Sequence, residues 1–408
     1  MRKNWFPTMN NSGIALVTIL AIGGLSSGSL TYAQDAQGVT SPIQELTEKD
    51  IQESQEGSEI PLEEKDLDTP EKKLAEIDRL TKMINAYLMN FKGNQNRYFS
   101  PKDLEYNDPL PQRQRLIWRY YEDDPGSEKT AILMDERWRL MTTKLKKHGF
   151  VMSETLEVQK NDAISDQLRA TAVYWHTYSS IVSTIRAPLS KPAQLEKQAA
   201  NFIDKYPDDP RGASLLGYIV LRLDRFPDEQ LELYRRIGRE YPDTYMGQIG
   251  KGKGRQVDEV GKPFALEFDD VRSGTHNSIE DWRGHVVVVD FMSTFCRPCM
   301  AQLPDFINLE KSLADEGVVF VAVSLDRMEE RGGKSAILGM IDEARLDWPV
   351  FYQGMGFQSP FSRDWGISKI PVQFVIDQEG NLRSTNAGVA LEAVIKGLLE
   401  EAKEKNEK

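Results

Sequence analysis

A run of four valines leads toward the only two cysteines of the chain. The segment Val286–Phe291 is apolar and β-branched, which is typical of a buried strand. From Met300 to Ala314 the apolar residues recur at helical spacing, so Cys296 and Cys299 fall at a junction between a strand and a helix. Unpaired backbone N–H groups and the helix dipole stabilise a thiolate there, and the thiolate is the species that attacks disulfides. The sequence therefore predicts thiol–disulfide exchange.

Three other uses of a Cys-x-x-Cys pair compete with exchange. A structural disulfide would close a loop too small to restrain the unfolded chain much. A zinc site needs two more ligands, and His276 and His285 lack the usual spacing. A peroxidatic cysteine in a Pro-x-x-x-Thr-x-x-Cys motif would need proline and threonine where the chain has Val289 and Ser293. Exchange is the favoured interpretation, and neither a metal nor a cofactor is expected.

The residues around this pair resemble the thioredoxin superfamily, and within it the exported TlpA/ResA type. The resemblance extends over residues 258–402, a little over a third of the chain. It rests on the motif Asp290–Cys299, on Pro304 in the following helix, on the segment Gly366–Asp377 with Ile370-Pro371, and on a stretch from 261 to 284 that is similar to an extra N-terminal hairpin.

The resemblance implies a role for each matching residue. Cys296 would be the nucleophile, Cys299 would resolve the mixed disulfide, and Asp290 would accept the proton of Cys299. Burial at the end of a valine strand should raise the pKa of Asp290, because it disfavours the charged carboxylate. The alternative for Asp290 is a structural, satisfied carboxylate. Pro371 would follow a cis peptide bond.

Four residues are implied to contact the client protein. They are Phe295, Arg297, Pro298 and Ile370. Phe295 and Arg297 depart from the tryptophan and glycine that are usual in the family. Gln302 stands where ResA-like members usually have glutamate, so a role of that carboxylate in setting the redox potential is not implied here.

The beginning of the chain predicts export. Two basic residues precede an uncharged stretch from Gly13 to Ala33, and small residues end it, which is typical of a signal peptide over residues 1–33. An uncleaved membrane anchor is the alternative, because the apolar stretch has an ambiguous length. The predicted location is periplasmic or otherwise extracytoplasmic, with membrane contact only if the segment stays uncleaved.

Residues 34–68 form an acidic segment without aromatic residues. Eleven acidic residues face two lysines, which gives −9 of the net charge of −12. Such a composition cannot bury enough apolar surface to fold, so a disordered linker is expected. The remainder is near charge balance, which gives no indication of nucleic-acid binding.

Residues 69–250 are predicted to form a helical domain. Thr69 and Pro70 suit a helix start. Tyr-Pro-Asp recurs at 206–208 and 241–243, and this 35-residue spacing is close to that of tetratricopeptide-like hairpins, although an irregular bundle fits equally well. Further helices are expected at 129–147, 162–185, 193–206, 211–223 and 229–241.

Residues 256–403 are predicted to form an α/β thioredoxin-like domain with a central mixed sheet flanked by helices. Strands are expected at 286–291, 318–325, 372–376 and 382–384, and helices at 298–314, 334–345 and 391–405. The first two strands should be parallel because a helix joins them, and the last two should form a hairpin. These helices are expected to cover both faces of the sheet.

The favoured function is a cell-envelope thiol–disulfide oxidoreductase that acts as a reductant or isomerase of protein disulfides. Its partners would be client proteins and a membrane-bound electron donor. One alternative is a helical binding or scaffold protein with an accessory redox domain, and another is a peroxiredoxin-like thiol peroxidase. A matched nucleophile, resolving thiol and acid favour the oxidoreductase.

Overall fold

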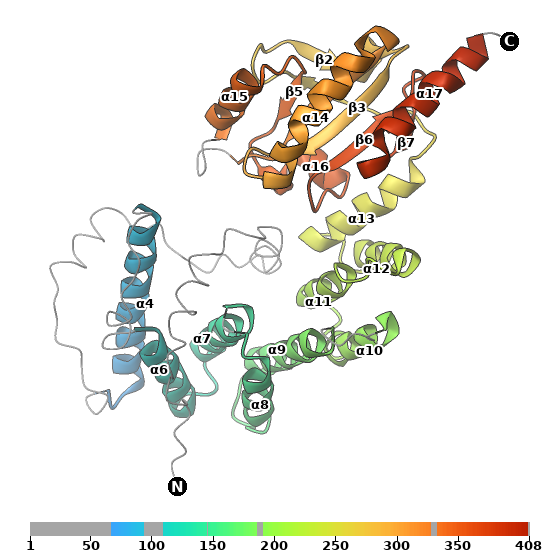
Figure 1. Ribbon diagram of the computed structural model, residues 1–408. Coiled ribbons are helices and arrows are strands. Elements are labelled where there is room, and N and C mark those ends of the chain that lie inside the picture. The colour runs from blue at the N-terminus through green and yellow to red at the C-terminus, as the bar shows by residue number, and fades with distance from the viewer. Residues whose placement is uncertain (1–66, 94–108, 145, 186–190, 328–332, 407–408) are drawn as a thin grey trace. The chain divides into compact units, whose positions relative to one another are not determined.

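The computed structural model describes residues 67–93, 109–144, 146–185, 191–327 and 333–406 (Figure 1). The predicted signal peptide (1–33) and nearly all of the predicted acidic linker (34–68) lie outside these residues. Within the described ranges no helix is both long and apolar enough to cross a membrane. The chain divides into two compact units, Met1–Arg222 and Leu223–Lys408.

The described part of the first unit is built from helices. They are α4 (Pro70–Gly93), α6 (Pro109–Asp123), α7 (Glu128–Arg139), α8 (His148–Val158), α9 (Asp166–Ile185), α10 (Pro192–Ile203) and α11 (Arg211–Val220). As predicted, α4 begins at Pro70, and Ile77 and Leu80 on its apolar face are buried. The helical run predicted over 129–147 is confirmed over most of its length, because α7 passes directly into a π-helical stretch, Leu140–Lys144, before α8 begins.

The second unit begins with a helical hairpin, α12 (Pro227–Glu240) and α13 (Tyr245–Asp258). The domain boundary predicted between residues 250 and 256 therefore lies inside a helix. Glycine-rich sequences disfavour helices, which is why the sequence did not predict α13. Here the glycines allow close packing: a Cβ on Gly250 would lie 2.3 Å from the Tyr234 carbonyl oxygen of α12, and one on Gly252 would lie 2.1 Å from the backbone nitrogen of Gly366.

The two Tyr-Pro-Asp segments both lie between packed helices. The first follows α10 and leads to α11, and the second joins α12 to α13. The 35-residue spacing therefore corresponds to two helical hairpins, one in each unit. Their relation to tetratricopeptide repeats stays a prediction.

A five-stranded mixed sheet forms the centre of the second unit, in the order β5-β4-β3-β6-β7. The strands are β3 (Val286–Met292), β4 (Val318–Ser324), β5 (Val350–Tyr352), β6 (Val372–Ile376) and β7 (Leu382–Ser384). β3 and β4 are parallel and β6 and β7 are antiparallel, as predicted. The short edge strand β5 was not predicted. Every residue of the central strand β3 is buried, which explains its unbroken apolar sequence.

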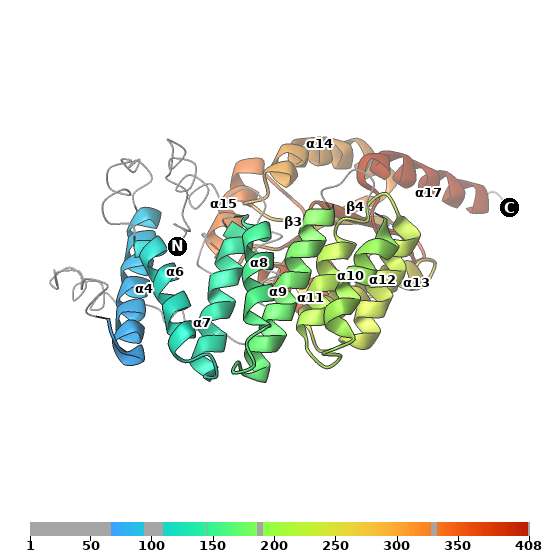
Figure 2. The same cartoon turned by 90° about the horizontal axis from the view of Figure 1, so that it is seen from below.

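Three helices cover one face of this sheet: α14 (Arg297–Leu313), α15 (Gly333–Ala344) and α17 (Leu391–Asn406) (Figure 2). The opposite face is covered by the hairpin of β1 (Glu267–Asp269) and β2 (His276–Ser278) and by the short helix α16 (Pro360–Asp364). The expectation that the three predicted helices would divide between both faces is therefore wrong. Aromatic residues of the hairpin and of α16 fill the second face instead.

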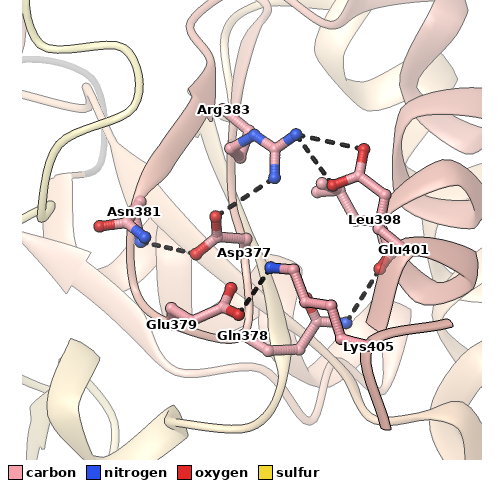
Figure 3. A network of polar contacts seen from close by, with 8 residues as sticks. All are labelled: Asp377, Gln378, Glu379, Asn381, Arg383, Leu398, Glu401 and Lys405. Carbon is pink, nitrogen blue, oxygen red and sulfur yellow. Dashed lines mark hydrogen bonds and ion pairs between the residues drawn. The ribbon is translucent and has the colours of Figure 1, made fainter. Parts of the chain in front are cut away.

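A polar network holds α17 against the turn between β6 and β7 (Figure 3). Arg383 donates to Asp377 at 3.3 Å and to Glu401 of α17 at 3.0 Å. Lys405 of α17 pairs with Glu379 of the turn at 2.9 Å. The network lies at the surface of the second unit. It fixes the position of α17, which packs on the face of the sheet that also carries the cysteines.

Candidate active site

The two cysteines lie where the link after β3 turns into α14. Cys296 directly precedes the first residue of α14, and its Sγ accepts a hydrogen bond from the Cys299 backbone N–H at 3.2 Å. Cys296 thus occupies the place of a helix N-cap, with sulfur as the acceptor. The two residues are joined by a disulfide, with their Cα atoms 5.3 Å apart. The helix start therefore offers one N–H group directly to the sulfur of Cys296.

Both cysteines are buried in this disulfide form. Cys296 is 8% exposed and Cys299 is 4% exposed. The residues beside Cys296 are exposed: Phe295 at 37%, and the neighbouring Arg297 and Pro298. The site consequently presents an apolar ring, a cation and a proline around a sulfur that is itself largely covered.

Asp326 organises the link that leads to Cys296, and the sequence did not predict this role. Its carboxylate accepts the Thr294 backbone N–H at 3.1 Å and the Ser324 hydroxyl at 2.8 Å, and the residue is 2% exposed. This role could have been predicted from the sequence, because Asp326 follows a predicted strand that was expected to lie parallel to β3. The carboxyl ends of such neighbouring strands lie at the same edge of the sheet.

Asp290 is buried in the middle of β3, with 4% exposure. Along β3, Val288 and Met292 contact the same core cluster as the two cysteines. Side chains alternate between the faces of a strand, so Asp290 points to the face that carries Cys296 and Cys299. Loss of hydration raises the pKa of Asp290 to about 6, and a hydrogen bond from Gln373 acts in the opposite direction. The raised pKa that the sequence predicted is present.

The Ile370–Pro371 peptide bond is cis, the geometry that the resemblance implied. Pro371 directly precedes β6, the antiparallel neighbour of β3. Ile370 is partly buried and packs against the core clusters on both faces, including the cluster that contains the cysteines. The fold thus brings the cis-proline segment to the part of the domain where the cysteines lie.

Gln373 is the second residue that the sequence did not single out. It lies on β6 directly opposite Asp290, and its Nε2 donates to Asp290 Oδ1 at 2.8 Å. Among the residues that the structure describes, no three His, Cys, Asp or Glu side chains gather as metal ligands. On the face that carries the cysteines, the site therefore offers two sulfurs, the buried carboxylate of Asp290 and the buried amide of Gln373.

Residues 259–385 match the AhpC/TSA family. The chain is 25% identical over 141 residues to the thioredoxin-like protein YneN of Bacillus subtilis, which covers 35% of this chain and 75% of YneN. The thiol-disulfide oxidoreductase ResA of Bacillus cereus is 22% identical over 138 residues, 34% of this chain and 73% of ResA.

Among solved structures, a thiol:disulfide interchange protein of the thioredoxin family from Chlorobium tepidum is similar to this chain. The identity is 24%, the alignment covers 34% of this chain and 94% of that protein, and the TM-score is 0.29.

Proposed function

We propose that this chain, whose C-terminal region is a thioredoxin-like domain as the AhpC/TSA match indicates, is a protein thiol–disulfide oxidoreductase. The observation that carries the proposal is the contact at the start of α14, where a backbone N–H is directed at the sulfur of Cys296. The hydrogen bond from this N–H group and the helix dipole stabilise the thiolate form of Cys296 at neutral pH. The relatives named thiol-disulfide oxidoreductases support the same activity.

In the reducing direction the reaction begins with the dithiol. The Cys296 thiolate attacks one sulfur of a client disulfide, the client S–S bond breaks, and the first client sulfur leaves as a thiolate. Cys299 then loses its proton to the Asp290 carboxylate and attacks Cys296 Sγ, which releases the second client thiolate. Two electrons pass to the client, and the protein is left with the Cys296–Cys299 disulfide.

Cys296 is assigned as the nucleophile because it precedes the helix, whereas Cys299 lies within its first turn. Phe295, Arg297 and Pro298 surround this sulfur with exposed surface, which suits contact with an extended client segment. Ile370, just before the cis-proline, is the further residue proposed to contact the client. Main-chain pairing at this segment would orient the client disulfide toward Cys296.

We further propose that the protein works outside the cytoplasm as a reductant or isomerase, and that a membrane-bound partner keeps it reduced. The support for export is the uncharged stretch over residues 13–33 after two basic residues. Edman sequencing of the protein recovered from the periplasm or medium should then begin at Gln34. Recovery of the intact N-terminus in the membrane fraction would show an uncleaved anchor instead.

Reduction of insulin by the full-length chain, with dithiothreitol as electron source, tests the activity. We expect catalysed precipitation of the insulin B chain, and no acceleration by the variants Cys296→Ser and Cys299→Ser. Hydrogen peroxide consumption, measured under the same conditions, tests the thiol peroxidase alternative. Absence of insulin turnover by the wild type would refute the proposal and leave the scaffold or peroxidase alternatives.

A further inference from the structure

Asp290 and Gln373 are a directly opposed pair between two antiparallel strands. The register places Asp290 of β3 against Gln373 of β6, so the two side chains project to the same face. The Nε2–Oδ1 distance is 2.8 Å, and the residues are 2% (Gln373) and 4% (Asp290) exposed. The amide therefore faces the carboxylate in a dry part of the domain, on the side of the sheet that α14 covers.

The neutral amide has a different effect from that of a cation at the same place. Burial alone disfavours the ionised carboxylate, and a donated hydrogen bond favours it. The pKa of Asp290, about 6, is the outcome of these opposing influences, with the loss of hydration the larger. A lysine or arginine partner would hold the carboxylate ionised to far lower pH and make it a poor proton acceptor. An amide leaves the group able to gain and lose a proton near neutral pH.

The other groups around Asp290 leave Gln373 as the partner that acts on its charge. β4 places Ala322 beside Asp290. Leu391 of α17 belongs to the apolar cluster on the same face of the sheet. The causes of the pKa shift of Asp290 are its burial and the hydrogen bond from Gln373, and no charged side chain among the described residues contributes to it. The charged side chains of α14 and α17 that are exposed to solvent are Arg297, Asp305, Lys311, Glu392, Lys396, Glu400, Glu401, Lys403, Glu404 and Lys405.

We propose that Gln373 is a positioning residue of the resolving step, which holds the Asp290 carboxylate ionised and aimed so that it accepts the proton of Cys299 near neutral pH. The inference rests on the proposed function and adds the residue that tunes its base. Because Gln373 donates to Oδ1, the other carboxylate oxygen is the one left to take the proton. Gln373 contacts neither the client nor the reacting sulfurs in this assignment.

The test follows the two steps separately in the reduced full-length chain. The reagent 5,5′-dithiobis(2-nitrobenzoate) is attacked by Cys296 and releases one thionitrobenzoate. Attack by Cys299 on Cys296 Sγ then releases the second, and with only two cysteines in the chain the absorbance trace has two phases. Stopped-flow traces between pH 5.5 and 9 give the pH midpoint of the second phase for the wild type, Gln373→Met and Gln373→Val.

We expect the midpoint of the second phase to move upward by about one to two pH units in both variants, since a hydrogen bond to a charged group is lost. At pH 6 the second phase should slow about tenfold, and above pH 8.5 it should return to the wild-type rate. Valine suits a strand and has no hydrogen-bond donor, so one variant remains if the methionine variant does not fold. A uniform slowing at every pH, or no change, would overturn the proposal.

Two controls separate an effect through Asp290 from a general structural one. Gln378→Met removes a glutamine that donates to the Leu398 carbonyl oxygen at 3.3 Å, away from the carboxylate, and should leave the midpoint unchanged. In an Asp290→Asn background, Gln373→Met should move the midpoint no further, because coupled residues are not additive. An equal shift in that background would refute the inference.

The failure of the inference and the failure of the proposed function give different traces. If the wild type releases only one thionitrobenzoate, the resolving step does not occur and the proposed function fails. If the wild type releases two and the Gln373 variants keep its midpoint, only the positioning role is lost.

Discussion

Replacing Asp290 by asparagine should stabilise the C-terminal unit at neutral pH and leave it little changed in acid. The pKa of Asp290 is about 6 in the folded protein, against 3.8 for the ordinary carboxyl. Below pH 3.8 both the folded and the unfolded state carry the proton. Between these values the unfolded state loses the proton first, so stability falls as the pH rises, and above pH 6 the whole penalty is present. Asparagine has no such titration.

The size of the effect follows from the difference between the two pKa values. A difference of 2.2 units, 6 minus 3.8, corresponds to about 3 kcal/mol at 25 °C. In the wild type, the ionisation of Asp290 should lower the free energy of unfolding by about 0.5 kcal/mol at pH 4 and by nearly the full amount of about 3 kcal/mol at pH 7. Asparagine has almost the same shape as aspartate, and its Oδ1 still accepts the hydrogen bond from Gln373. The variant therefore removes the charge and keeps the contact.

Hydrogen exchange of the amides of β3 and β6 measures this penalty in the oxidised full-length chain. These strands are fully buried, so their slowest amides report the free energy of opening of the unit. Comparing the variant with the wild type at one pH cancels the intrinsic exchange rates. We expect the stability advantage of the variant to grow by about 2.5 kcal/mol from pH 4 to pH 7. An advantage that is the same at both pH values would refute the raised pKa.

Three further predictions concern the cysteines, α13 and the redox potential. In the thionitrobenzoate assay Cys299→Ser should retain the mixed disulfide and Cys296→Ser should react slowly, because only Cys296 lies at the helix start. Faster alkylation of Cys299 than of Cys296, in the reduced chain at mildly acidic pH, would reverse the roles assigned to the two cysteines. In denaturant unfolding, Gly252→Ala should lower the free energy of unfolding by about 1–3 kcal/mol, because its Cβ would clash with Gly366. Gly254→Ala, whose Cβ would lie 3.6 Å from its nearest neighbour, should raise it by up to about 1 kcal/mol through helix propensity. Equal effects of the two substitutions would contradict the packing account. A glutathione titration should place the potential nearer to about −270 mV than to about −120 mV, and a midpoint above about −150 mV would exclude the reductant.

The chemistry of the site was predictable because it depends on residues that are close in sequence. The valine strand, the two cysteines and the helix after them form one continuous segment, and the cis-proline directly precedes β6, whose bounds the sequence predicted without error. Local backbone preferences and the alternation of apolar residues are enough to define such segments. The valines also predicted a buried, raised-pKa carboxylate at Asp290.

The partners of these residues depended on the tertiary structure. Asp290 and Gln373 are 83 residues apart, and only the antiparallel register of β3 and β6 places them opposite each other. Asp326 likewise accepts a hydrogen bond from Thr294, because the two residues follow neighbouring parallel strands, β4 and β3, whose ends lie at the same edge of the sheet. A sequence shows which side chains are chemically suited to interact, but register and strand order decide which of them meet.

In the glycine-rich helix α13 the local sequence preference and the tertiary structure favour different conformations. By local preference Gly247, Gly250, Gly252 and Gly254 argue against a helix, and the sequence placed a domain boundary there. In the fold, the missing side chains let α13 approach α12 and Gly366 at distances that a Cβ would prevent. The sequence by itself determined the strand, the thiol pair and the buried acid, because these follow from short-range patterns. The tertiary structure alone decided where glycine stabilises a helix, because the contacts that favour it come from distant backbone.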